Sequence, residues 1–448
     1  MARNAHPGSK RRVALTGFVV LSALWLANCG TWFGERDDQA LPGERITVMV
    51  HERRVQPDPT LQGVPIQLPR PVTNADWPQS GGYANHAMHH LWVEDDLQRA
   101  WKVDVGAAAD TSQPRLAPPI VAAGRLYAMD AEHTVSAFDA QSGERLWETE
   151  LAPDDEEDLI PGGLAFADGR VFVTTGFADV LALDAATGAE LWRSRVEAPL
   201  HAPPTAAGGR VFAIAVTNTL YAFDAASGVA LWNYRAIAEL AALVGGAAPA
   251  IDGGVVVAPF SSGELVALIA ETGQVLWSDS FASTRRTDEI ANLAQIRGAP
   301  VIDRGRVFAV SFGGLVAAVD LRTGRRIWDQ DIGGTERPWV AGDYIYLISK
   351  SNELVCLNRD SGGVHWIAPL PAFEDEEDLE DPIFWAGPVL AGDRLVVVGS
   401  NEEILTISPY TGDYLGRVDA SAPISVAPVV AGGSLYVLSD DADLHAFR

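Results

Sequence analysis

Three histidines close together, His86, His89 and His90, are the side chains of this sequence best suited to bind a transition metal. A zinc site needs three or four ligands held by regular structure. No fourth ligand accompanies these histidines, and no strand or helix pattern surrounds them. We therefore interpret them as a surface cluster in a mobile segment, and we expect neither a metal nor a cofactor.

The sequence lacks the motifs of common catalytic mechanisms. It contains no Gly-x-Ser-x-Gly nucleophile turn, no His-Glu-x-x-His zinc motif and no phosphate-binding loop. Two acidic runs, 154–158 and 374–378, lack the glycine of an EF-hand loop. We interpret both as solvated loops, with a site for a cation or a basic partner as the alternative. The sequence therefore predicts a protein that is not an enzyme.

The charge balance bears on the class of partner. The formal net charge is −26, from 33 basic and 59 acidic side chains. So negative a chain is repelled by nucleic acid and by anionic membrane surfaces. We expect no nucleic-acid partner.

The N-terminus reads as an export signal. A basic region is followed by a mostly apolar run from residue 13 to residue 27, which is short for a membrane span. The run ends at Cys29, and residues 26–30 resemble a lipobox, in which the cysteine receives a lipid. Asn28 departs from the small residue usual before that cysteine, and an ordinary secretory signal is the alternative. Because Gly30 is not aspartate, the resemblance implies sorting to the outer membrane, facing the periplasm.

The second cysteine, Cys356, has no partner if Cys29 is lipidated. It occupies a position of the repeat described next where alanine is the usual residue. We expect a buried cysteine that acts as a small apolar side chain.

An eleven-residue phrase that occurs seven times organises the rest of the sequence. The copies begin at residues 137, 182, 222, 267, 318, 356 and 406. Each resembles Ala-x-Asp-Ala-x-Thr-Gly-x-x-x-Trp, and Gly416 replaces the tryptophan in the last copy. A repeat of about 40–50 residues is typical of propellers and other repeat folds.

Each repeat carries the signals of four short strands. Within the phrase, the glycine supplies the positive φ of a tight hairpin and the aspartate caps the turn. A second glycine hairpin, such as Gly124-Arg125-Leu126, lies upstream of each phrase. Four antiparallel strands per repeat predict the blade of an all-β propeller, with the tryptophans packed between blades.

Two chain ends are expected to share the eighth blade. Residues 443–448 match the start of the phrase but lack its turn and its tryptophan strand, which a segment around Trp101 supplies. Pairing the ends would close a ring of eight blades and remove its open edges. We divide the chain into a signal peptide (1–28), a lipid-anchored, proline-rich tether (29–90) and an eight-bladed propeller (91–448).

The phrase resembles the pyrroloquinoline-quinone-type propeller repeat over residues 91–448. Quinoprotein dehydrogenases and the BamB family of barrel-assembly lipoproteins share this repeat. The lipobox, the tether and the single propeller are similar to the BamB family. The alcohol dehydrogenases carry a vicinal disulfide that this chain cannot form. The resemblance implies a non-catalytic scaffold of the barrel-assembly machinery, with a quinoprotein oxidoreductase or a binder of another envelope protein as alternatives.

The resemblance also implies a docking site for the POTRA domains of BamA, made of two loops. The match of the first loop contains Leu243 and, in place of the family's arginine, Val244. The match of the second contains Gln295, Ile296 and Arg297, where the family's acidic pair is replaced. We expect these residues to lie together at one rim, together with Arg285 and Arg286. An ordinary long loop is the alternative, and unfolded outer-membrane protein precursors are a further candidate partner.

Overall fold

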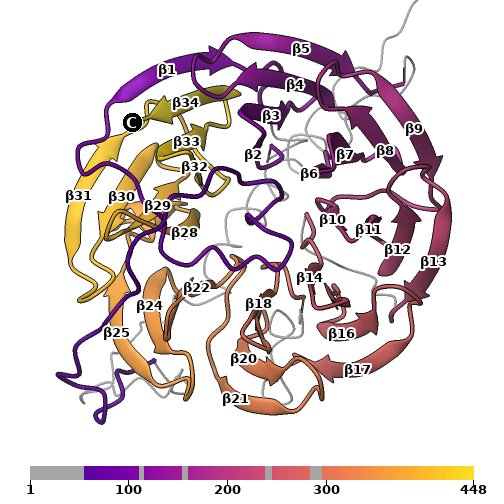
Figure 1. Ribbon diagram of the computed structural model, residues 1–448. Helices are drawn as coiled ribbons and strands as arrows, with labels where there is room; N and C mark the ends of the chain where they lie inside the picture. Colours follow the sequence, from indigo (N-terminus) through magenta and orange to yellow (C-terminus); the bar gives the residue numbers. More distant parts are fainter. Residues whose placement is uncertain (1–54, 110–115, 154–159, 238–244, 283–294) are drawn as a thin grey trace, which may run out of the picture. The chain divides into compact units, whose positions relative to one another are not determined.

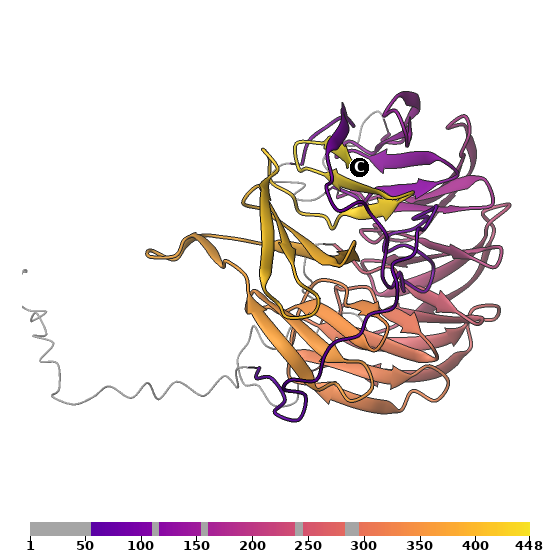
Figure 2. The same ribbon diagram turned by 60° about the vertical axis from the view of Figure 1, so that its left-hand side comes forward.

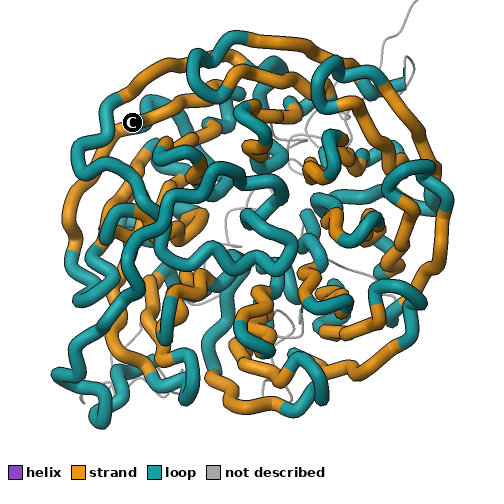
Figure 3. The backbone as a smooth tube through the Cα atoms, in the orientation of Figure 1, coloured by secondary structure: helices purple, strands orange, loops and turns teal. Residues whose placement is uncertain are grey.

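The computed structural model describes residues 55–109, 116–153, 160–237, 245–282 and 295–448. The described chain consists of strands and loops without a helix (Figure 3). Accordingly, no helix among these residues is long and apolar enough to cross a membrane. Residues 55–448 form one compact unit, which contains every strand of the described chain.

Eight four-stranded antiparallel sheets are arranged around a centre, which confirms the predicted eight-bladed propeller (Figure 1). Blades one to four are β2 (Ile120–Ala122), β3 (Arg125–Met129), β4 (Thr134–Asp139) and β5 (Arg145–Glu150); β6 (Gly163–Ala167), β7 (Arg170–Thr174), β8 (Asp179–Asp184) and β9 (Glu190–Arg195); β10 (Thr205–Ala207), β11 (Arg210–Ala215), β12 (Thr219–Asp224) and β13 (Ala230–Arg235); and β14 (Ala250–Asp252), β15 (Val255–Pro259), β16 (Glu264–Ile269) and β17 (Val275–Ser280).

The later blades follow the same order from the inner to the outer strand. Blades five to seven are β18 (Val301–Asp303), β19 (Arg306–Ser311), β20 (Leu315–Asp320) and β21 (Arg326–Gln330); β22 (Trp339–Ala341), β23 (Tyr344–Ile348), β24 (Glu353–Asn358) and β25 (Val364–Pro369); and β28 (Trp385–Ala391), β29 (Arg394–Gly399), β30 (Glu403–Ile407) and β31 (Tyr414–Asp419). A small hairpin, β26 (Phe373–Asp375) and β27 (Glu380–Pro382), lies between blades six and seven. It contains the acidic run 374–378, whose residues are exposed as expected, and it projects away from the ring (Figure 2).

Blade eight is closed by pairing of the first strand with the last strand of the described chain, as the sequence predicts. It contains β32 (Val429–Ala431), β33 (Ser434–Leu438), β34 (Asp443–Phe447) and, as its outer strand, β1 (Arg99–Asp104). β1 pairs antiparallel with β34, and Trp101 lies opposite Ala446. Backbone hydrogen bonds between Gln98 and Arg448 extend this pairing.

The turn of the phrase folds as its residues dictate. In blade one, Asp139 Oδ1 accepts hydrogen bonds from the backbone N–H and the hydroxyl of Ser142, at 2.8 and 3.0 Å. Gly143 follows with a φ of 76°. These hydrogen bonds favour the carboxylate and lower the pKa of Asp139. Asn358 makes the same contacts in the sixth copy through its amide oxygen.

The tryptophans join neighbouring blades, which confirms their predicted position. Each packs its ring on the phrase glycine of the next blade, so closely that a Cβ on the glycine would lie 2.5–2.9 Å from it. The pairs are Trp101–Gly143, Trp147–Gly188, Trp192–Gly228, Trp232–Gly273, Trp277–Gly324, Trp328–Gly362 and Trp366–Gly412. The indole N–H often also donates to that blade, as Trp192 does to Ala225 O at 3.1 Å. Seven of the eight seams are therefore locked by an indole ring.

Residues 74–91, which we call the inner segment, touch the innermost strand of every blade. Asn74 Nδ2 donates to Val430 O in blade eight (2.6 Å), and Trp77 N donates to Val121 O in blade one (2.6 Å). The circuit ends where Leu91 N donates to Leu390 O in blade seven (3.2 Å). The contacts between these points are Phe166 N to Pro78 O, Ala206 N to Gln79 Oε1, Ile251 N to Ala84 O, Ile302 N to Asn85 O and Trp339 Nε1 to His89 O.

The prediction of an extended tether over residues 29–90 is wrong for the inner segment. Residues 29–54 lie outside the described part of the chain, but the inner segment is packed in the ring, where it crosses the centre of Figure 1. Trp77 and Leu91 are each only 2% exposed. The contacts of the inner segment cover the inner edges of the blades, which would otherwise present unpaired backbone groups.

Candidate functional site

A channel runs through the middle of the propeller and is lined by all eight blades. Most lining residues immediately precede an inner strand, such as Pro203, Ala248 and Ala299. The inner segment contributes Trp77, Ser80 and Gly81 to the lining. Together these residues leave a cavity of about 150 Å³.

The two mouths of the channel differ. Each inner strand begins where the chain arrives from the preceding blade and ends at a tight turn. Flanking residues of the inner segment contact those turns, because Pro69 packs on Gly342, Val93 on Gly392 and Trp92 on Gly433. The inner segment therefore covers the mouth on the side of the turns. The opposite side carries the connections between blades, and we call it the connection face.

The channel wall is basic in an otherwise acidic protein. Arg297 and Arg337 line it, and Glu336 is the one acidic side chain in the described lining; His201 also lines it, but burial lowers its pKa and so favours the neutral ring. Burial lowers the pKa of Arg337 to about 10, although the charge of Glu336 opposes this shift. The Nε of Arg337 has no hydrogen-bond partner within the described part of the chain. A Cβ on Gly81 would clash with Arg337 Nη1, so this glycine makes room for the guanidinium.

The histidine cluster is structural, and its prediction as a mobile surface cluster is wrong. His86 and His90 are each 2% exposed, and each Nδ1 lies 2.7 Å from a backbone carbonyl oxygen, of Pro300 and Pro69 respectively. Burial, assisted by the charge of Arg337, lowers the pKa of His86 to about 3, so the ring is neutral at neutral pH. His89 is half-exposed and lies 3.5 Å from Asp303.

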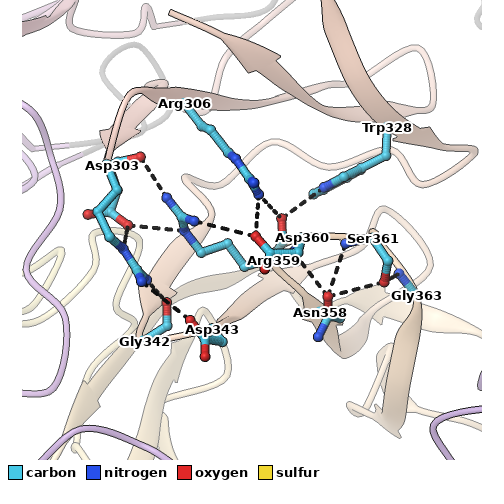
Figure 4. Close-up of polar contacts among 11 residues, drawn as sticks. Asp303, Arg306, Trp328, Gly342, Asp343, Asn358, Arg359, Asp360, Ser361 and Gly363 are labelled. Atoms are coloured by element: carbon cyan, nitrogen blue, oxygen red, sulfur yellow. Dashed lines mark hydrogen bonds and ion pairs between the residues drawn. The ribbon is translucent and has the colours of Figure 1, made fainter.

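Beside His89, a polar network fixes the seam between blades five and six (Figure 4). Buried Arg359 donates through Nε to Asp303 Oδ2 at 3.1 Å and through Nη2 to Asp303 O at 2.8 Å. Arg304 Nε donates to the same carboxylate oxygen at 3.0 Å. The network lies next to a surface groove of about 510 Å³, lined by Asp303, Arg304 and residues that flank or belong to the inner segment.

The structure narrows the predicted docking site. Leu243, Val244, Arg285 and Arg286 lie outside the described residues. Ile296 is 2% exposed and packs in the core of blades four and five, and Gln295 is 4% exposed. Because a buried side chain cannot be a surface contact, neither residue serves the role that the sequence suggested.

Arg297 keeps a position suited to docking. It is half-buried at the wall of the channel, where the chain enters blade five. A Cβ on Gly245 would lie 3.8 Å from Arg297 Nε, so the described ends of the two predicted loops are neighbours. Sequence reasoning missed Arg337 and Glu336, which lie on the same wall but outside the phrase and outside any known motif.

The channel does not fit the quinone cofactor of the dehydrogenases that share the repeat. A cavity of about 150 Å³ is the size that holds benzene in other proteins. Pyrroloquinoline quinone has three fused rings and three carboxylates, and it is much larger. Within the described ranges, no group of three or more histidine, cysteine, aspartate or glutamate side chains is placed to hold a metal ion.

Comparisons with protein families place these observations in context. A family described as "Outer membrane protein assembly factor BamB" matches residues 131–368 and 375–448. A second family, described as "Glucose/ethanol/alcohol dehydrogenase, beta-propeller domain", matches residues 93–165. The first match covers most of the ring, whereas the second covers little more than one blade.

Individual proteins give the same picture. The outer membrane protein assembly factor BamB of Escherichia coli strain K12 is 32% identical over 354 residues, covering 78% of this chain and 88% of that protein. BamB of Xanthomonas campestris pv. campestris is 33% identical over 359 residues, covering 79% and 86%.

Solved structures share the fold. BamB from Moraxella catarrhalis superimposes with a TM-score of 0.67 at 22% identity, covering 79% of this chain and all of that one. Quinohemoprotein alcohol dehydrogenase from Comamonas testosteroni has a TM-score of 0.60 at 14% identity, covering 83% and 80%. At such identities the likeness establishes the propeller alone.

Proposed function

The chain belongs to the family of the outer membrane protein assembly factor BamB, and from this membership we propose that it is a non-catalytic scaffold of the outer-membrane β-barrel assembly machinery. A lipid on Cys29 holds it at the periplasmic face of the outer membrane. The family match across most of the ring carries this proposal. The small volume of the channel supports a role without a quinone cofactor.

The partner in this proposal is BamA, whose POTRA domains dock on the connection face next to Arg297. Three observations support this location. Arg297 and Gly245 bring the ends of the two predicted loops together. Arg297 and Arg337 give the wall a basic character that suits an acidic partner surface. Among the described residues, the inner segment lies at the opposite mouth, where it contacts the inner strands.

Exchange of Arg297 tests the docking site. We expect Arg297→Glu to reduce co-purification of BamA with the tagged lipoprotein from solubilised membranes by about tenfold. A glutamate there would repel an acidic partner surface, which weakens the contact and slows association. Arg325→Glu is the matched control. Arg325 is exposed on a phrase turn, on the side away from the connections, so the same charge change there should leave BamA recovery unchanged.

The same experiment separates the proposal from its alternatives. Parental recovery of BamA with folded Arg297→Glu protein would place the dock elsewhere on the ring. Recovery of a different envelope protein, without BamA, would contradict the assembly role. Unfolded outer-membrane protein precursors would appear as transient partners, and cross-linking before solubilisation would retain them.

A further inference from the structure

The seam between blades seven and eight lacks the lock found at every other seam. In the last phrase Gly416 stands where the tryptophan belongs, and a Cβ there would meet only Thr406 Oγ1, at 3.2 Å. Blade eight offers no phrase glycine to receive a ring. In that place Gln98, just before β1, and Arg448 pair through their backbones. Both halves of the tryptophan–glycine contact are therefore absent.

A cavity of about 240 Å³ lies at this seam. One wall is Ile404 and Val418, the pair next to Thr406 and Gly416 on the same face of blade seven. Val437 and Phe447 of blade eight form the other wall, and Ile424 contributes to the lining from the connection. Ile404, Ile424 and Val437 are buried apolar residues of the lining, and the buried polar side chains of Ser439 and His445 share it. A cavity of this size holds an aromatic ring, since one of about 150 Å³ holds benzene.

The outer strand beside the cavity is open to a partner. β31 is the last strand of its blade, and all six of its residues are exposed. Leu415 is 57% exposed and Val418 is 52% exposed. Such an edge offers backbone N–H and C=O groups to an added strand, whose alternate side chains would face blade eight and the cavity.

The rim of the cavity carries an arginine that forms no ion pair with a described residue. Arg99 is exposed there and has no hydrogen bond or ion pair to any described residue. An acidic group, Asp419, lies at the same rim, where it accepts a hydrogen bond from Ser421 N at 2.7 Å and forms no ion pair with Arg99. Lys102, further along β1, is paired with Asp443 at 2.6 Å. Arg99 therefore favours an occupant with a carboxylate near its aromatic side chain.

We propose that this seam binds an extended peptide segment, which adds to β31 as a fifth strand and inserts an aromatic side chain into the cavity. The aromatic side chain of the peptide fills the place that an indole of the protein itself fills at the other seams. A carboxylate on the peptide pairs with Arg99. This inference goes beyond the scaffold role, because it assigns a binding site for unfolded chain that needs no other subunit. Its failure would leave the docking on BamA untouched.

A capped peptide of alternating threonine and valine, with a central tryptophan followed by aspartate, is a suitable probe. We expect the purified mature protein to bind the dye-labelled peptide in fluorescence anisotropy, and about tenfold more weakly when alanine replaces the tryptophan. Hydrogen exchange should show new protection confined to β31. Protection in another blade, or equal binding of the alanine peptide, would overturn the proposal.

Two variants test the cavity and its rim separately. Val418→Trp fills the cavity from within and should weaken binding about tenfold. Leu146→Trp is its control, because it adds an indole at a similarly exposed site, 43% exposed, on the outer strand of blade one. Arg99→Glu should weaken binding of the aspartate peptide but not of its asparagine counterpart. If Val418→Trp fails to fold, Arg99→Glu still tests whether the peptide binds at this seam. Equal binding of the aspartate and asparagine peptides by the parent protein would contradict the role of Arg99.

Discussion

The glycine of the repeated phrase meets two demands at one position. In blade three, Gly228 has a φ of 73°, which L side chains rarely adopt, and a Cβ there would lie 2.5 Å from the ring of Trp192. Gly209, in the turn between β10 and β11 of the same blade, has a φ of 72° and open space around it. The sequence predicted the backbone demand from the turn pattern. The contact demand could not be predicted, because it depends on how the preceding blade is placed.

This pair allows the two demands to be measured separately. We expect Gly209→Ala to lower the free energy of unfolding by about 1–2 kcal/mol, the cost of left-handed backbone for alanine. Gly228→Ala should cost about 1–3 kcal/mol more, because the methyl group overpacks the seam. Urea unfolding of both variants measures the difference. Equal losses would show that the indole contact adapts to the methyl group without strain.

At the scale of elements, the strands were predictable and the inner segment was not. Glycine turns, apolar strand residues and the tryptophan period locate every blade, because each blade repeats one local solution. Residues 74–91 have no strand alternation, and the glycine pair Gly81-Gly82 is not part of the repeated pattern. Their position rests on single hydrogen bonds to strands far away in the chain, and such contacts leave no period in a sequence. The histidines within them were misread for the same reason.

Gln79 provides a test of the inner segment. Its side-chain amide imitates a strand backbone, because Nε2 donates to Ala206 O at 2.7 Å and Oε1 accepts from Ala206 N at 3.0 Å. Gln79→Ala would leave both buried groups of Ala206 unpaired, and we expect a loss of about 2–5 kcal/mol in the free energy of unfolding. Gln67→Ala is the control, since Gln67 is exposed, and it should change stability by less than about 0.5 kcal/mol. A similar small change at Gln79 would show that the inner segment merely lies in the channel.

At the scale of the whole molecule, the ring has one symmetric plan and two departures from it. The inner segment closes one mouth, which gives the propeller two unlike faces. The seam between blades seven and eight lacks its indole, so one outer edge differs from the other seven. A docking face and a strand-binding edge on separate parts of the ring would allow one molecule to hold a partner subunit and an unfolded chain together.

Closure of the propeller by pairing of β1 with β34 keeps these surfaces folded. β34 is paired on both sides, with β33 and with β1, so its loss would open blade eight from within. We expect a chain that ends at residue 439 to aggregate or to melt at a much lower temperature, because unpaired strand edges associate and the apolar faces of blades one and seven lose their cover. A chain that begins at Val55 is the control. It keeps every described strand, and it should melt like the parent protein in calorimetry. If the chain that ends at residue 439 also melted like the parent, the ring would be held by its tryptophan seams rather than by the pairing of its two ends.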